Sequence, residues 1–230
     1  MIVFPSSTLV GKPVPKTAFY RNLEVNAKVK QRFVDDVASI TWTAKIAPST
    51  LNVADGKDVH EIVVFHIVLK AEDTPDDVFL TIDRQMPRHG VFLLQYEERY
   101  RLLLNYKEWA DAEKGVFNIV KTFRTDWQPA DTLTLSLEGS TMDKLYEHMA
   151  GQISGFGTAT AADTRRAVAL QDDIRSKQRQ AEALQKRVRA EKRFDRQMEL
   201  NSQARALKQE VARLTQQLNE LTNKNKITRL

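Results

Sequence analysis

Apolar side chains follow two different periods in the first part of the chain. Val29, Phe33 and Val37 recur at spacings of four, which predicts a helix over 26–37. Every second residue is apolar over 39–46, which is typical of a half-buried strand. The same patterns predict further strands over 61–70, 90–96, 100–106, 117–123 and 132–137, and further helices over 75–86 and 142–153. Because the strands follow one another in runs, the pattern favours an α+β domain with a mixed or antiparallel sheet and helices packed on it.

The C-terminal part of the chain has the heptad spacing of a long α-helical coiled coil. Its apolar positions alternate spacings of four and three and are Leu200, Ala204, Leu207, Val211, Leu214, Leu218 and Leu221. An earlier stripe over 170–188 does not keep this register through 191–199, where Phe194 and Met198 fall off the seam. This mismatch predicts either one helix with a stutter or a helical hairpin. In both cases the leucine stripe needs cover, so we predict that it is a partner-helix interface.

Glycine and proline mark where the two parts meet. All 8 glycines and all 7 prolines lie at or before Gly157. Since these residues interrupt helices and strands most strongly, their absence beyond that point indicates a change of architecture. We therefore predict an α+β domain over 1–153, a linker over 154–163 and a basic helical or coiled-coil tail over 164–230.

The net charge of +5 is unevenly distributed along the chain. From Asp163 onward there are 17 basic and 9 acidic residues, a net charge of +8, which leaves −3 for the preceding part. A basic tail of this kind suits an anionic partner. The possible nucleic-acid contacts are Lys186, Arg187, Arg189, Lys192, Arg193 and Arg196. Because acidic residues are interleaved among them, as on an ordinary coiled-coil surface, docking on a partner helix is the favoured interpretation.

Composition excludes several kinds of chemistry. The chain has no cysteine, which rules out disulfides, cysteine-bound zinc, iron–sulfur clusters and thiol catalysis. The histidines His60, His66, His89 and His148 lack the spacing of metal ligands. His66 is predicted to be a half-buried strand residue and His89 a turn residue that serves the backbone. We predict no catalytic residue, no cofactor and no metal site. No secretory signal and no apolar run of membrane-spanning length is visible, so we expect a soluble cytoplasmic protein without a membrane partner.

An α+β domain with a basic appendage also raises the alternative of a metal-dependent nuclease with a non-standard site. Such enzymes need carboxylates for Mg²⁺ and a lysine that steadies the attacking water. No acid-x-Lys lies on a predicted strand, and the nearest match, Asn105-Tyr106-Lys107, has an amide in place of the carboxylate. For this alternative the residues to test are Glu61, Asp83 and Lys107.

Several stretches resemble an uncharacterised bacterial family known only as domain of unknown function number 4391. They are 4–12, 14–16 with 19–20, 40–42 with 45–53, 59–67, and 191–201. None contains a catalytic motif, and the resemblance carries over no functional residues. Members of this family tend to be encoded beside helicases and DNA methyltransferases of restriction or phage-defence loci. The resemblance therefore implies an accessory subunit of a DNA-acting defence system.

We therefore expect a non-catalytic adaptor subunit of a restriction or antiphage complex. Its helical tail is expected to dock on a helicase or DNA methyltransferase of the same locus, or on a second copy of the chain. The alternatives are direct DNA binding by the basic helix and the metal-dependent nuclease.

Overall fold

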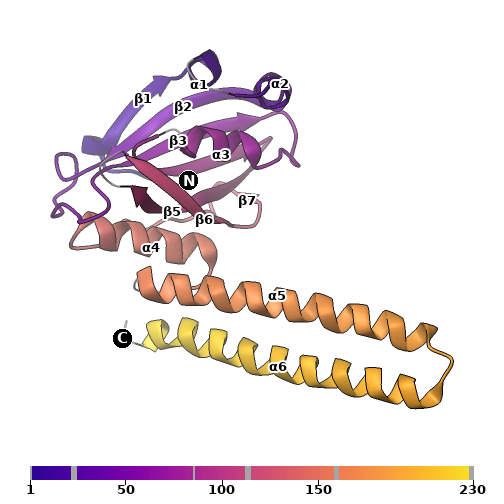
Figure 1. Ribbon diagram of the computed structural model, residues 1–230. Coiled ribbons are helices and arrows are strands. Elements are labelled where there is room, and N and C mark those ends of the chain that lie inside the picture. The colour runs from indigo at the N-terminus through magenta and orange to yellow at the C-terminus, as the bar shows by residue number, and fades with distance from the viewer. Residues whose placement is uncertain (1, 22–24, 85, 112–114, 158–160, 228–230) are drawn as a thin grey trace. The chain divides into compact units, whose positions relative to one another are not determined.

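The structure is a computed structural model that describes residues 2–21, 25–84, 86–111, 115–157 and 161–227. The chain divides into two compact units, Met1–Gly155 and Phe156–Leu230. The first unit contains a seven-stranded mixed sheet with short helices, and the second contains two long helices (Figure 1). The expected mixture of helices with a mixed sheet is confirmed.

The sheet runs in the order β1-β2-β3-β4-β5-β6, and a short strand β7 pairs with β5. The strands are β1 (Leu9–Pro13), β2 (Val37–Ile46), β3 (Ile62–Leu69), β4 (His89–Tyr96), β5 (Arg99–Asp111), β6 (Val116–Arg124) and β7 (Gln128–Pro129). Strands β3 and β4 pair in parallel, and the other strand pairs are antiparallel. A parallel neighbour cannot be reached by a tight turn, and helix α3 (Asp77–Arg84) makes the crossover between β3 and β4.

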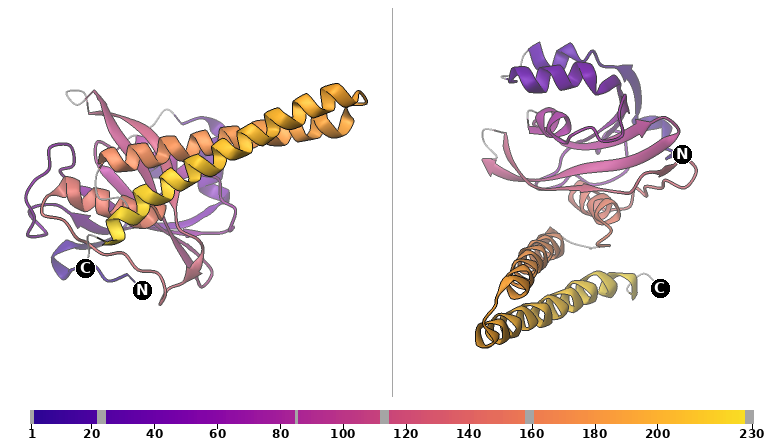
Figure 2. Two further views of the ribbon diagram at one scale, coloured as in Figure 1. Left: turned by 90° about the horizontal axis from the view of Figure 1, so that it is seen from below. Right: turned by 90° about the vertical axis from the view of Figure 1, so that its right-hand side faces the viewer.

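Helices cover both faces of this sheet. Helices α1 (Thr17–Arg21), α2 (Ala27–Asp35) and α3 lie on one face, and α4 (Met142–Ser154) lies on the other (Figure 2, right). The contacts of β5 show the same arrangement, because successive residues of a strand point to opposite faces. The side chains of Asn105 and Lys107 bond to backbone carbonyls of the α3 region, whereas Tyr106 donates to Glu147 of α4.

The core under α2 and α3 combines aliphatic side chains with fully buried aromatic rings. Phe33 of α2, Phe79 of α3 and Phe92 of β4 are all enclosed there. Phe79 and Phe92 pack with ring centroids 5.9 Å apart, within the range in which aromatic pairs attract. The helix periods read from the sequence at these positions are confirmed.

One predicted strand is wrong. Residues 132–137 form no strand, although Leu133 and Leu135 are buried on alternate positions as a strand would bury them. Their backbone is held by a side chain instead. The Gln152 amide of α4 accepts from the Ser136 N–H and donates to the Ser136 carbonyl, both at 2.9 Å. The pattern identified the buried side chains but could not show that a side-chain amide replaces a neighbouring strand.

The second unit is a helical hairpin. Helices α5 (Ala161–Ala190) and α6 (Phe194–Ile227) run antiparallel and lie side by side along their length (Figures 1 and 2). The chain turns at 191–193 without glycine or proline. The Glu191 carboxylate accepts from the backbone N–H groups of Lys192 and Arg193 at 2.9 and 3.0 Å, which caps the start of α6. Of the two arrangements that the register mismatch left open, the chain adopts the hairpin.

Candidate partner and nucleic-acid interface

The leucine stripe of α6 is only partly covered within the hairpin. Leu200, Ala204 and Leu214 are buried. The other four stripe positions, Leu207, Val211, Leu218 and Leu221, are half-buried and are called the apolar strip below. On α5, Ile174 and Ala181 are buried, and Leu184 and Val188 are half-buried. The two stripes therefore cover each other in part, so a second copy is not needed to hide the most buried leucines.

Two polar contacts fix the register of the hairpin. The Lys177 ammonium of α5 lies 3.2 Å from a carboxylate oxygen of Glu210 on α6. Nearer the turn, the Gln197 amide donates to the Val188 carbonyl at 3.1 Å. Lys177 lies within the earlier stripe over 170–188, and its half-buried position with an acidic partner explains how a lysine is tolerated there.

The predicted nucleic-acid contacts come together at the turn of the hairpin. Lys186, Arg187 and Arg189 end α5, and Lys192, Arg193 and Arg196 follow the turn into α6. We call residues 186–196 the distal tip. It contains six basic and two acidic residues, a net charge of +4. The hairpin thus joins on one end of the unit two groups of cations that a single continuous helix would spread along its length.

Both acidic residues of the distal tip are engaged locally. The pKa of Glu191 is lowered by hydrogen bonds from the backbone N–H groups of Arg193 and Lys192. Asp195 forms an ion pair with Arg193 at 2.7 Å. Over the described stretches of the chain, no ion pair forms at Lys186, Arg187, Arg189 or Lys192, whereas the charge of Arg196 acts on both Glu191 and Asp195. The first four cations are available to an external anion.

Two large apolar side chains are exposed beside these cations. Phe194, the first residue of α6, is 73% exposed, and Met198, one turn further, is 60% exposed. Both are the residues that fall off the heptad seam, which explains their exposure. Phe194 and Met198 therefore add exposed apolar surface to the cations of the distal tip.

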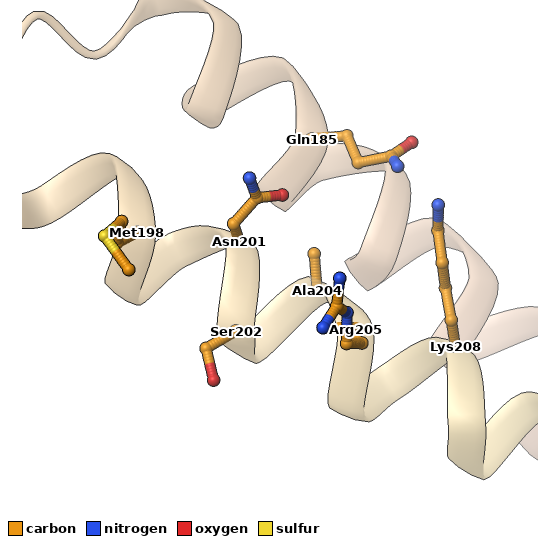
Figure 3. Close-up of a pocket in the computed structure, with 7 residues that line it drawn as sticks. All are labelled: Gln185, Met198, Asn201, Ser202, Ala204, Arg205 and Lys208. Atoms are coloured by element: carbon orange, nitrogen blue, oxygen red, sulfur yellow. The ribbon is translucent and has the colours of Figure 1, made fainter. Parts of the chain in front are cut away.

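A hollow of about 460 Å³ lies between the two helices next to Met198. Gln185 of α5 borders it, and Asn201, Ala204 and Lys208 are among the α6 residues that line it. In Figure 3, the polar ends of Asn201 and Lys208 point toward α5, while Ser202 points away. Its rim therefore carries amide and cationic donors, including Arg205.

The three residues of the nuclease alternative lie in the first unit, but only Asp83 and Lys107 contact each other, and both are fully buried. The Lys107 ammonium lies 2.7 Å from Asp83, and both side chains are 0% exposed. Lys107 also donates to the backbone carbonyls of Asp83, Met86 and Arg88, which follow or end α3. Burial raises the pKa of Asp83 and lowers that of Lys107, while their mutual attraction opposes both shifts. Lys107 therefore pins the end of α3 to the sheet.

Glu61, the third residue of that alternative, is neutralised at the surface. Its carboxylate contacts Arg88 at 2.8 Å and Lys45 at 3.1 Å. Within the described residues, no three His, Asp or Glu side chains are grouped so as to hold a metal ion. The geometry gives Glu61, Asp83 and Lys107 structural ion pairs and offers no position where they jointly face a substrate.

The two histidines singled out from the sequence have different surroundings. As predicted, His66 is half-buried on a strand, β3, and its ring bonds to Gln95 at 2.8 Å. His89 is not a turn residue. It begins β4, is buried, and packs its ring edge-on against Tyr146 and Phe117. Burial, with a smaller effect of the Lys107 charge, lowers its pKa to about 3, so the ring is neutral at physiological pH.

Comparison with known proteins adds the family. The model of a family described as a domain of unknown function, DUF4391, matches residues 2–225. The chain belongs to this family. No curated protein matches the chain, and no solved structure matches it either. The DUF4391 match covers both units, so the hairpin is part of what defines the family rather than an appendage to it.

The sequence predicted which cations belong to the candidate interface, but it did not show that the turn between α5 and α6 brings them together. The heptad break at Phe194 and Met198 indicated a possible turn, and the capping role of Glu191 is visible only in the structure. None of the helices in the described part of the DUF4391 chain combines the length and apolar composition needed to cross a bilayer.

Proposed function

We propose that this DUF4391 protein is a non-catalytic adaptor subunit of a DNA-acting assembly of the restriction or antiphage type. The sheet unit is a rigid body, and the hairpin is the element that docks on a partner protein. The observation that carries the proposal is the apolar strip, which the hairpin's own packing leaves half-covered. A helicase or DNA methyltransferase encoded beside the protein is the partner that the family resemblance implies.

Two antiparallel helices alone bury only part of each apolar stripe. A third helix laid along the hairpin completes the cover and gives a three-helix arrangement, as in helix-in-groove recognition. Burial of a leucine or valine side chain that is otherwise exposed contributes about 1.5–3 kcal/mol, so each partly exposed position of the apolar strip supplies a fraction of that value. The apolar strip has four such positions.

The buried polar cluster supports a non-catalytic role. Lys107 and Asp83 are the lysine and the carboxylate that a nuclease site would need. Both side chains are fully buried, and Lys107 holds the end of α3. On the hairpin, by contrast, exposed apolar groups and cations lie close together, at Phe194 and Met198 and in the distal tip. The functional surface of the protein is therefore one of recognition.

The test is co-purification with the helicase or methyltransferase encoded beside the chain, from lysate treated with nuclease so that DNA cannot bridge the proteins. The variant Leu207→Glu with Val211→Glu places two charges on the apolar strip. We expect it to lose at least about tenfold of the recovered partner, since about 1.4 kcal/mol already corresponds to that factor. The matched control, Gln203→Glu with Ala212→Glu, changes two exposed positions of the same helix and should keep the partner.

Far-UV circular dichroism of both variants separates loss of docking from loss of the hairpin. Equal recovery of the partner by the strip variant and the control, with helix content retained in both, would rule out the apolar strip as the docking surface. Absence of any complex with the unaltered chain would remove the adaptor function itself.

A further inference from the structure

The distal tip differs from the rest of the hairpin in the balance of its charges. Toward the other end of the hairpin, Glu210 lies within 4 Å of both Lys177 and Arg213, so acids and bases offset each other there. At the tip, one acid caps the turn and the other is paired with Arg193. The remaining cations therefore concentrate positive potential at the distal tip.

The exposed Phe194 makes this tip unlike an ordinary solvated charge run. It is the first residue of α6 and directly follows Lys192 and Arg193. At 73% exposure, Phe194 leaves most of its ring in water, and covering that ring favours binding. Aromatic rings next to cations stack on the faces of nucleic-acid bases while the cations neutralise phosphates.

The hollow lies along the same edge of α6. Arg205 and Lys208 follow Phe194 by 11 and 14 residues, which at about 1.5 Å per residue places them roughly 16 and 21 Å along the helix. Together with the amides of Gln185 and Asn201, these two cations give the hollow donors suited to phosphate and sugar oxygens. Cationic contacts therefore continue from the distal tip into the hollow.

We propose that the distal tip and the hollow bind nucleic acid that has unpaired bases. The tip cations contact backbone phosphates, Phe194 stacks on one unpaired base, and Arg205 and Lys208 hold the strand further along. This binding goes beyond the adaptor function and uses a different surface from the apolar strip. Recognition is independent of sequence, because backbone phosphates and the faces of bases carry little sequence information.

A nucleic acid fits this surface better than a membrane does. Helices that lie on membranes present a continuous apolar face. In the described part of the hairpin, Phe194 and Met198 are the only exposed large apolar side chains, and cations surround them. An acidic protein segment shares the charge but offers no flat ring for Phe194.

The test is fluorescence anisotropy with the full chain and three labelled oligonucleotides: a single strand, a blunt duplex, and a duplex with a single-stranded overhang. We expect tighter binding of the single strand and the overhang than of the blunt duplex. Phe194→Ala should weaken binding to unpaired bases by about 5- to 150-fold, the range that corresponds to 1–3 kcal/mol per stacked base, and leave the blunt duplex unaffected.

The cations are tested by the variant that replaces Arg187, Arg189, Lys192 and Arg196 with glutamine. The slope of log affinity against log salt for the single strand should become shallower by up to about 3, since each neutralised phosphate contributes roughly 0.7. The control replaces four exposed lysines of the sheet unit, Lys12, Lys28, Lys30 and Lys57, with glutamine and should keep the slope.

Three outcomes would overturn the proposal. The first is that the full chain binds no oligonucleotide at low salt. The second is that the tip variant and the lysine control lose the same amount of salt slope. The third is that polyglutamate of the same charge displaces the oligonucleotide at equal concentration. Binding to anionic vesicles that Phe194→Ala abolishes, without oligonucleotide binding, would assign the tip to membranes. Because these assays use the purified chain alone, their failure leaves the adaptor test unaffected.

Discussion

Replacing Lys107 with methionine is expected to lower the free energy of unfolding by about 3–5 kcal/mol. Methionine fills the space of the lysine stem but leaves the Asp83 carboxylate, which is 0% exposed, without its partner. It also removes the donor to three backbone carbonyls at the end of α3. Urea unfolding followed by tryptophan fluorescence measures the loss. For a chain with ordinary stability, this is a large fraction of the total.

The control for this prediction is Lys45→Met. Lys45 is also a strand lysine with a carboxylate partner, Glu61, but it is 37% exposed, so its ion pair is worth at most about 1 kcal/mol. Adding Asp83→Leu to Lys107→Met should recover part of the loss, because no buried charge then remains, while the α3 carbonyls still lack their donor. A Lys107→Met variant as stable as Lys45→Met would show that Lys107 does not pin α3.

Stability is expected to fall steeply with acid because of His89. Its folded-state pKa of about 3 lies below the ordinary 6.5, so the unfolded chain takes up a proton that the folded chain does not. The stabilisation is complete above pH 6.5 and is lost as the pH falls toward 3. Relative to neutral pH, the loss of unfolding free energy from this residue is about 2 kcal/mol by pH 5 and about 4 kcal/mol by pH 3.5. Urea unfolding at pH 7, 6 and 5 measures this dependence.

The variant His89→Phe isolates the effect. It keeps an aromatic ring against Tyr146 and Phe117 but cannot be protonated, so its stability should depend less on pH by those amounts. Two other groups also make stability depend on pH. Burial lowers the pKa of His66, which acts in the same sense, and raises the pKa of Asp83, which acts in the opposite sense. Both contributions are present in His89→Phe and in the unaltered chain. His60→Gln, at an exposed position, is the control. Parallel pH profiles for His89→Phe and the unaltered chain would contradict a buried neutral His89.

The spacing of apolar residues along the chain was sufficient to predict most helices and strands of the sheet unit. The helices around Phe33 and Phe79, and the strands from β2 to β6, follow from apolar residues at spacings of four or two. Strand β1 and helix α1 were missed because neither is long enough to establish a period. The wrong strand over 132–137 has the correct alternation, and only the position of Gln152, 16 residues later, decides its hydrogen bonding.

The candidate interface was predictable in its residues and not in its geometry. The cations from Lys186 to Arg196 could be read directly, and the heptad break was correctly placed. Whether α5 and α6 form one helix or two is decided at the turn. There, no glycine marks the end of α5, and the Glu191 carboxylate accepts hydrogen bonds from the Lys192 and Arg193 N–H groups, a contact that no sequence period shows. Likewise, Asp83 and Lys107 are 24 residues apart in sequence, and no local pattern shows that they meet.

The fold-back of α6 onto α5 within one chain is tested most directly by chemical crosslinking. The native chain has no cysteine, so the variant Lys177→Cys with Glu210→Cys introduces the only two thiols, at positions whose side chains are in contact across the hairpin. A short thiol-to-thiol crosslinker should join them within one molecule, so that intact mass spectrometry gives a monomer of about 26.3 kDa that carries one crosslinker attached at both cysteines. Crosslinked dimers in place of that product, or no crosslink at all, would show that the leucine stripe is covered by a second chain or by a different arrangement of the helices.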